Sequence, residues 1–300
     1  YPSYVAELTS QTGLPTGYDE SGTVEVAWDG ADLAALRDLH TFGTSLELRS
    51  HLLGAHELRA LEPSLAAGLP GGLLAEHDYQ VDPRLLHAAQ LAAAFELGAA
   101  LHAATARVDI AAGRARGVVL SDGSHIGADT VVLAAGAWSG QLDAVPVRPV
   151  KGQTLRLRLP GEPRLRHTVR ANVKGNPVYV VPRADGRVVV GASSEERGFD
   201  VEPRAGAVYE LLRDAQSVLP ELGEAVLEEV CTGLRPGSAD NAPLIGPSAV
   251  DGLLYATGHY RNGILLTPVT ADAIAAMIAD GTVPEVVAPF APSRLARAAS

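Results

Sequence analysis

The residues best suited to chemistry lie in the run Gly258-His259-Tyr260-Arg261-Asn262-Gly263-Ile264-Leu265-Leu266. An apolar strand is predicted before this run, at residues 253–257, and an apolar helix within and after it, from Ile264 to Ile278. A strand, a glycine turn and a helix N-terminus together present unpaired backbone N–H groups and the positive end of a helix dipole. With the guanidinium of Arg261 in the same turn, the pattern predicts a site for an electron-rich or anionic ligand.

A second arginine stands in a similar setting. Arg235 lies in the run Thr232-Gly233-Leu234-Arg235-Pro236-Gly237, after an apolar strand predicted at residues 225–232. A surface arginine is the more common interpretation, but the glycines and the proline restrict the backbone here, and Arg261 offers a counterpart. A guanidinium binds a carboxylate through two parallel hydrogen bonds. Two such arginines facing one cleft would hold a small anion.

Other motifs of catalysis are weak or absent. Glycines spaced as G-x-G do not occur, so the sequence has neither the G-x-G-x-x-G fingerprint nor a Walker loop. The run Gly136-Ala137-Trp138-Ser139-Gly140 has the spacing G-x-x-S-G, which favours a structural turn over a nucleophile elbow. The nine histidines are scattered without an H-x-x-x-H pair, so no metal site is expected. Tyr179 and Cys231 are interpreted as a sheet tyrosine and a buried small hydrophobe.

Composition limits the class of protein. The 300 residues are 47% hydrophobic and 20% charged, as expected for a globular chain with a large core. The net charge of −11 argues against binding to nucleic acid or to an anionic membrane. No apolar run is long enough to span a bilayer. The single cysteine excludes a disulfide framework and fits a reducing compartment, so we expect a cytoplasmic protein.

The positions of the predicted elements indicate two interleaved parts. An α/β pattern occupies the first half, with a continuous apolar strand at residues 129–139 that we expect to be buried on both faces. Residues 154–159 then alternate strictly, and a hairpin is predicted around Ala184-Asp185-Gly186, which indicates an antiparallel sheet. Further elements are predicted as strands 22–28, 100–111, 114–120, 177–182 and 187–191, and as helices 29–42, 56–61, 82–98 and 204–219.

Four runs resemble the FAD-dependent D-amino-acid oxidase superfamily, and its closest branch is the glycine oxidase of thiamine biosynthesis. They are Asn176-Pro177-Val178-Tyr179-Val180-Val181-Pro182, Val190-Gly191-Ala192-Ser193, Gly233-Leu234-Arg235-Pro236 and the run from Gly258 to Leu266. Residues 80–83, 133–139 and 149–153 support the resemblance. The likeness follows the same order along nearly the whole chain, and the run from Gly258 is its most specific motif.

The resemblance implies an α/β and α+β fold in which an incomplete, Rossmann-like FAD-binding domain is interleaved with an antiparallel-sheet substrate domain. The FAD-binding domain would comprise residues 73–148 and 233–300, and the substrate domain residues 1–72 and 149–232. The family opens with a βαβ unit that carries G-x-G-x-x-G. Because Tyr1, Tyr4, Val5 and Leu8 already share one helical face, we interpret the chain as a piece of a longer protein and expect that unit upstream.

The resemblance also implies roles for particular residues. Arg235 and Arg261 would contact the substrate carboxylate, Tyr179 would line the active site, and Ser194 would approach the pocket. Residues implied to contact FAD are Gly136, Trp138, His259, Tyr260, Arg261, Asn262, Gly263, Ile264 and Leu265, the last seven through their backbone against the pyrimidine ring. On the adenine side, a gapless alignment points to Arg107 and a one-residue slip points to Val108.

The implied reaction is the oxidation of glycine or another small amino acid. Hydride would pass from the α-carbon to flavin N5, and water would convert the imino acid to an oxo acid, glyoxylate for glycine, and ammonia. O2 would reoxidise the flavin and give hydrogen peroxide, without a side-chain acid or base. The resemblance further suggests a role in thiazole and thiamine biosynthesis and a homo-oligomer.

Alternatives remain open at this point. Within the superfamily, the chain could be a sarcosine oxidase or a D-amino-acid dehydrogenase, and some relatives of that kind attach the flavin to a cysteine near the strand of Cys231. A different class of function is a non-catalytic remnant that binds small carboxylates or a partner without flavin.

Overall fold

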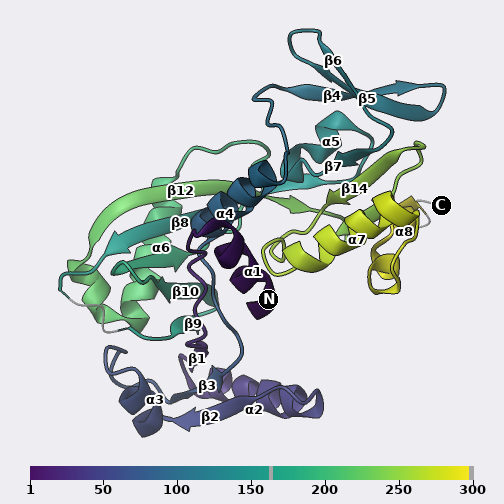
Figure 1. Cartoon of the computed structure of the whole chain (residues 1–300). Coiled ribbons are helices and arrows are strands. Elements are labelled where there is room, and N and C mark those ends of the chain that lie inside the picture. Colours follow the sequence, from purple (N-terminus) through teal and green to yellow (C-terminus); the bar gives the residue numbers. More distant parts are fainter. Residues whose placement is uncertain (162–164, 297–300) are drawn as a thin grey trace.

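The computed structural model describes residues 1–161 and 165–296. Its largest element is an eight-stranded sheet with the order β12-β8-β11-β10-β9-β1-β3-β2 (Figure 1). In that order, the strands are Val226–Gly237, Arg148–Arg158, Arg187–Gly191, Asn176–Pro182, Thr168–Val173, Thr23–Ala27, Gly71–Ala75 and Ser50–Gly54. Neighbours are antiparallel except β1 and β9, which run parallel. The sheet is therefore mixed, and the expectation of a purely antiparallel sheet was wrong at this one pair.

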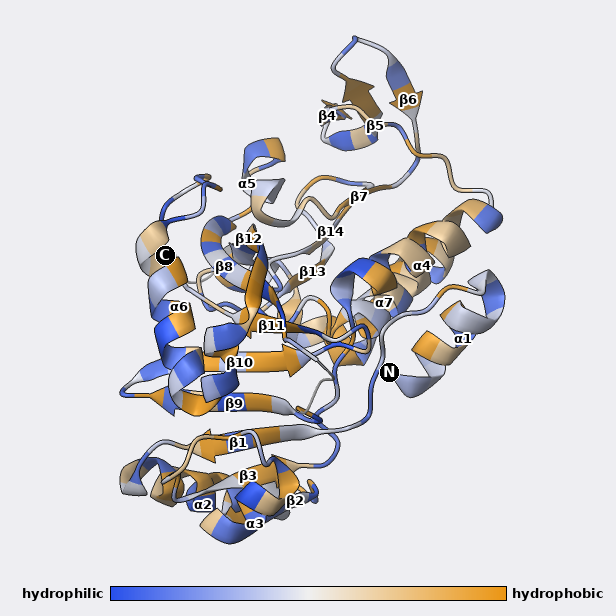
Figure 2. Cartoon of the chain, turned by 90° about the vertical axis from the view of Figure 1, so that its left-hand side faces the viewer, coloured by the Kyte–Doolittle hydropathy of each residue, from blue (hydrophilic) through white to orange (hydrophobic). Residues whose placement is uncertain are grey.

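The core of this part lies between the sheet and α6 (Ala205–Val218). Figure 2 shows α6 beside the apolar strands β9, β10 and β11. Side chains alternate between the two faces of a strand, so Val178 and Val180 enter the core while Tyr179 lies on the opposite face. The core members on the sheet meet Leu211, Ala215 and Val218 of α6. The same alternation therefore places Tyr179 on the face of the sheet away from this core.

The strand β12 is the longest in the sheet and pairs along its length with β8. The register shifts once, between Leu227 and Glu229, where β12 contains a bulge. From Glu229 opposite Arg156 to Gly237 opposite Arg148, the pairing is regular.

A second sheet has the order β13-β14-β7, formed by Leu244–Pro247, Leu253–Thr257 and Val131–Leu133. The strands β14 and β7 are parallel, as the predicted α/β pattern requires. The helix α7 (Thr267–Asp280) packs on one face, where Ile274 and Met277 meet Ile245 and Leu254. The third sheet joins β4 (Ala106–Ala111), β5 (Arg114–Leu120) and β6 (His125–Gly127).

The remaining helices are α1 (Pro2–Thr12), α2 (Gly30–Ser45), α3 (Ala55–Leu61), α4 (Pro83–Glu96), α5 (Ser139–Leu142) and α8 (Ser293–Ala296), with 3₁₀ turns at Gly136–Trp138, Pro220–Glu224 and Glu285–Phe290. The predicted start of α4 is confirmed, because the carboxylate of Asp82 accepts from the N–H groups of Arg84 and Leu85. Within the described residues, no helix is both long and apolar enough to cross a bilayer.

Several predicted strands differ from the structure. Residues 100–105 are irregular, so the predicted strand starts only at Ala106. The apolar run 129–139 contributes a short strand, β7, because the chain turns at Gly136, which has a φ of +54°. Its expected burial on both faces was also wrong, since Val132 remains 36% exposed. Strands β2, β3, β6, β9 and β13 were not predicted.

The cap of α4 predicts a measurable stability effect. Asp82→Ala removes the acceptor for two N–H groups at the helix start, so the free energy of unfolding should fall by about 1 kcal/mol or more. Urea denaturation measures this change. Asp38→Ala, at an exposed position within α2, is the control and should leave the unfolding midpoint nearly unchanged. Equal stability losses in the two variants would contradict the capping role.

Candidate active site

Two predicted site residues lie on the face of the large sheet opposite α6. Arg235 belongs to β12 and stands opposite Val150 of β8, while Tyr179 belongs to β10 and stands opposite Gly191 of β11. Since β8 and β11 are neighbours in the sheet, Arg235 and Tyr179 come from the strands on either side of that pair. Arg235 was predicted to follow its strand, but β12 continues to Gly237 and holds it within the sheet.

Two glycines make room for these side chains. A Cβ atom at Gly152 of β8 would lie 2.5 Å from Cζ of Arg235 and 2.6 Å from its Nη1. A Cβ atom at Gly191 would lie 2.8 Å from Cε2 of Tyr179. The guanidinium and the phenol ring therefore lie directly over backbone, which a larger residue at either position would prevent.

Arg261 lies near this site because the end of the second sheet contacts the end of the large sheet. Gly237 of β12 forms a bridge with His259, and the N–H of Tyr260 donates to the carbonyl of Pro236 at 2.9 Å. This pairing places the turn after β14 beside the end of β12. Burial lowers the pKa of Arg235, and the nearby positive charge of Arg261 lowers it further. The two predicted arginines are thus close enough to repel each other.

The site has an excess of positive charge. Among the described residues, neither Arg235 nor Arg261 has a carboxylate within 4.0 Å. Burial raises the pKa of Tyr179, so its phenol stays neutral at physiological pH. A hydrogen bond with Ser194 lowers the pKa of Tyr260, and the guanidinium of Arg261 lies 5.4 Å from the centre of the Tyr260 ring. Two guanidinium groups without carboxylate partners, beside the neutral phenol of Tyr179, suit a small carboxylate.

A cavity of about 570 Å³ adjoins Arg261. Its lining includes Pro177, Ser194 and Arg197, and it extends to Gly206 near the start of α6. Other lining residues belong to α6, and neither Arg235 nor Tyr179 lines the cavity, so the approach of Ser194 to the substrate pocket stays a prediction.

The turn from Gly258 to Leu266 offers backbone donors rather than a helix end. The helix α7 starts at Thr267, so the prediction of a helix from Ile264 was wrong; a hydrogen bond from Leu266 N–H to the carbonyl of Asn262 closes a separate turn first. The N–H groups of Arg261, Gly263, Ile264 and Leu265 have no protein acceptor in the described part of the chain. These donors can serve an electron-rich ligand.

The side chain of His259 contacts α7. Its Nε2 lies 3.0 Å from Oγ1 of Thr270 in α7, and burial lowers the pKa of the ring. His259 can therefore contribute to a ligand site only through its backbone.

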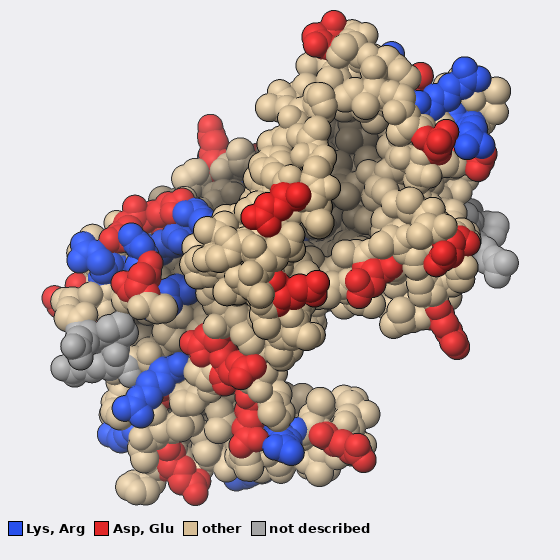
Figure 3. Space-filling view, viewed as in Figure 1, with Lys and Arg blue, Asp and Glu red and all other residues tan. Residues whose placement is uncertain are grey.

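The turns after the parallel strands β7 and β14 lie side by side. Gly136 and Gly258 have φ angles of +54° and +74°. Thr257 connects the turns, because its hydroxyl donates to the carbonyl of Gly136 at 3.2 Å and lies 2.7 Å from the hydroxyl of Ser139. Figure 3 shows the molecular surface hollowed where Figure 1 places these strands. Ligands of α/β sheets bind at such carboxyl ends of strands.

The remaining predicted cofactor residues are Trp138, Arg107 and Val108. Trp138 is 49% exposed and contacts the ring of Phe199, with 6.1 Å between ring centres. Arg107 and Val108 both belong to β4 of the third sheet. Val108 packs against the cluster that includes Leu133, whereas Arg107 is exposed. Their contact with the adenine side stays a prediction.

Comparison with known proteins identifies the family. The family model described as FAD dependent oxidoreductase matches residues 2–277. The chain belongs to this family. Its cofactor is FAD, and the described residues fit the flavin ring, because N–H groups without protein acceptors lie in the turn after β14, and Thr257 joins that strand to the glycine turn after β7. Residues 261–265 would hold the ring, and Gly136 would allow close approach.

Individual members of the family support this assignment. The chain is 34% identical over 295 residues to the bifunctional protein ThiO/ThiG of Synechocystis sp., covering 98% of this chain and 43% of that protein. It is 34% identical over 300 residues to glycine oxidase of Geobacillus kaustophilus, covering 98% and 78%. The chain therefore spans less than half the length of the bifunctional relatives.

Solved structures of family members have the same fold. The crystal structure of glycine oxidase from Geobacillus kaustophilus matches with a TM-score of 0.89 at 33% identity, covering 98% of this chain and 80% of that one. Iminodiacetate oxidase from Chelativorans sp. BNC1 matches with a TM-score of 0.88 at 29% identity, covering 97% and 81%. These matches confirm the mixed α/β fold of a glycine oxidase.

Sequence reasoning missed the supporting residues of the site. Gly152 and Gly191 had no predicted role, although an isolated glycine inside a strand pattern signals close approach to its backbone. Cys231 was predicted to be buried, but it is partly exposed and lies 3.4 Å from Nη2 of Arg84. The reason is that β12 forms an edge of the sheet, where Arg84 pairs with Glu229 at 2.7 Å.

Gly152 provides a test of this geometry. Gly152→Ala should displace the guanidinium of Arg235 and weaken the binding of acetate about 10-fold or more, as measured by ¹³C NMR titration. Gly233→Ala is a matched control, because Gly233 lies opposite Gly152 and a Cβ there would meet nothing within 4 Å. An unchanged acetate affinity in Gly152→Ala would show that Arg235 does not bind the anion.

Proposed function

We propose that the protein oxidises glycine or another small amino acid to the imino acid, which water converts to an oxo acid and ammonia. The observation that supports this proposal most strongly is the pair Arg235 and Arg261, which lack carboxylate partners in the described chain and lie beside Tyr179. The similarity to glycine oxidases supports it independently.

The residues of this chain would bind and orient the substrate. Arg235 would bind the carboxylate, with Arg261 beside it, and the neutral phenol of Tyr179 would donate a hydrogen bond. The bound FAD would supply the two-electron chemistry and pass the electrons to O2. The two positive charges disfavour an ammonium group nearby, so they would favour the neutral amine that such an oxidation requires.

The backbone donors of residues 261–265 have a separate role. Four N–H groups without protein acceptors would stabilise negative charge on an electron-rich ring without the cost of reorienting solvent. Positioning and electrostatics then account for what the protein contributes, and the site needs no side-chain base. On the resemblance to the thiamine branch, we further propose that the product serves thiazole formation.

A second candidate substrate class is an N-substituted glycine. One relative of similar fold is an iminodiacetate oxidase.

The first experiment is the visible spectrum of the protein mixed with FAD, before and after anaerobic addition of glycine. A bound-flavin spectrum that bleaches with glycine would support the proposal. Bleaching with sarcosine or iminodiacetate alone would favour the second substrate class. Bound flavin that no amino acid bleaches would contradict oxidation, and carboxylate binding without any flavin would favour a non-catalytic binding protein.

Arg235 provides a quantitative prediction. Arg235→Ala should raise KM for glycine about 30-fold or more, because a charge-assisted, two-point contact contributes about 2 kcal/mol or more. The value of kcat should change much less. Steady-state oxygen consumption measures both constants. Arg37→Ala, which removes an exposed arginine of α2, should match the wild type, and an unaltered KM in Arg235→Ala would refute its role.

A further inference from the structure

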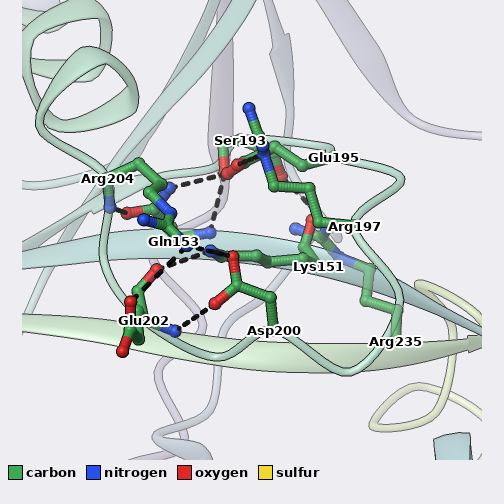
Figure 4. A network of polar contacts seen from close by, with 9 residues as sticks. All are labelled: Lys151, Gln153, Ser193, Glu195, Arg197, Asp200, Glu202, Arg204 and Arg235. Atoms are coloured by element: carbon green, nitrogen blue, oxygen red, sulfur yellow. Dashed lines mark hydrogen bonds and ion pairs between the residues drawn. The ribbon is translucent and has the colours of Figure 1, made fainter.

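A fully buried lysine lies beneath the proposed carboxylate site. The side chain of Lys151 is 0% exposed, and its Nζ donates to Oδ2 of Asp200 at 3.3 Å and to the carbonyl of Glu202 at 2.5 Å (Figure 4). The sequence has one other lysine, Lys174, which is exposed. Burying an ammonium group costs free energy of desolvation, and the attraction within an ion pair seldom exceeds that cost. Stability alone is therefore a weak explanation for Lys151.

The same strand fixes the start of the segment that carries Asp200. Lys151 and Glu195 exchange two backbone hydrogen bonds of 2.9 Å each. The hydroxyl of Ser193 accepts from the N–H of Gln153 at 2.9 Å and donates to Oε1 of Glu195 at 2.7 Å. These bonds hold residues 193–195 against β8.

The end of the segment is fixed as well. The buried side chain of Gln153 donates to Oε1 of Glu195 at 2.6 Å and accepts from the N–H of Arg204 at 2.8 Å. Asp200 also pairs with Arg204, at 2.7 Å. Residues 193–204 therefore form a loop. Gln153 bonds to both of its ends, and Lys151 bonds to its start through the backbone and to its later part through Nζ (Figure 4).

Arg235 depends directly on this network. Its Nη1 donates to the carbonyl of Ser193 at 3.0 Å and to the carbonyl of Lys151 at 3.4 Å. Both carbonyls belong to residues that the network fixes. Nε and Nη2 of Arg235 have no acceptor in the described part of the chain, so they stay available for a ligand. The direction in which those donors point thus follows from the position of Ser193 and Lys151.

We propose that Lys151, Gln153 and Asp200 are positioning residues, which set the loop 193–204 and, through the carbonyls of Ser193 and Lys151, orient the guanidinium of Arg235 toward a carboxylate. This inference rests on the proposed function, because it assigns the carboxylate to Arg235. Loss of the Lys151 ammonium lets the loop move, and Nη1 of Arg235 then loses its fixed acceptors. Affinity for the carboxylate falls, while the oxidation step changes little.

The test is a double-mutant cycle on the full chain with FAD. Lys151→Met should weaken acetate binding about 10-fold in ¹³C NMR titrations and raise KM for glycine by a similar factor, with kcat within about 3-fold of the wild type. In an Arg235→Lys background, which keeps a measurable charge, Lys151→Met should have little further effect. A loss of stability alone would not produce this dependence on Arg235. Lys174→Met, the matched control, should bind acetate normally.

The results separate this inference from the proposed function. Equal weakening by Lys151→Met in both backgrounds, or no weakening at all, would overturn the inference even if glycine is oxidised. The expected coupling in acetate binding without any glycine oxidation would support the inference and refute the proposed function. A wild type that binds no acetate would refute both. Asp200→Asn, which keeps the shape and removes the charge, replaces Lys151→Met if that variant fails to fold, and the same outcomes apply.

Discussion

The site depends on holding the guanidinium of Arg235 against the large sheet without pairing it with a carboxylate. A carboxylate beside Arg235 would occupy the group that binds the ligand, yet an isolated guanidinium in a partly buried place is unstable. The structure solves this with backbone carbonyls, which accept hydrogen bonds without adding negative charge. Close approach to those carbonyls in turn requires the missing side chain at Gly152. The glycine, the loop 193–204 and the buried Lys151 are all consequences of that one requirement.

The sequence allowed correct predictions where a structural element depends on residues close together in the chain. The cap and the proline predicted α4, strict alternation predicted part of β8, and the turn at Ala184-Asp185-Gly186 predicted the hairpin of β10 and β11. A helix was also predicted where α6 lies. The resemblance selected Arg235, Arg261 and Tyr179, which the structure does bring to one place. These residues lie in runs whose types and spacing are unusual enough to be noticed in a single sequence.

The predictions that were wrong or missed depend mainly on contacts between residues distant in the sequence. The parallel pairing of β1 with β9 joins strands more than a hundred residues apart, and no local pattern sets its direction. The burial of Lys151 follows from Asp200 and Glu202, which are distant in sequence, although a lysine beside a glycine looks like an ordinary surface residue. The start of α7 was misplaced because the apolar run Ile264-Leu265-Leu266 continues the helical pattern, while its backbone forms a separate turn.

The single bulge in β12 restricts how the length of this chain can vary. Inserting or deleting one residue in a paired strand moves every following side chain to the other face of the sheet. The bulge between Leu227 and Glu229 takes up one extra residue before the regular pairing begins, so it acts as the place where a change in length is absorbed. Beyond it, from Glu229 to Gly237, a change of one residue would turn Arg235 to the other face of the sheet, where Leu234 now stands opposite Lys151. Proteins that share this strand can therefore differ in length at its Val226 end. Between the bulge and Arg235, however, the number of residues can change only by an even number if Arg235 is to stay on the same face.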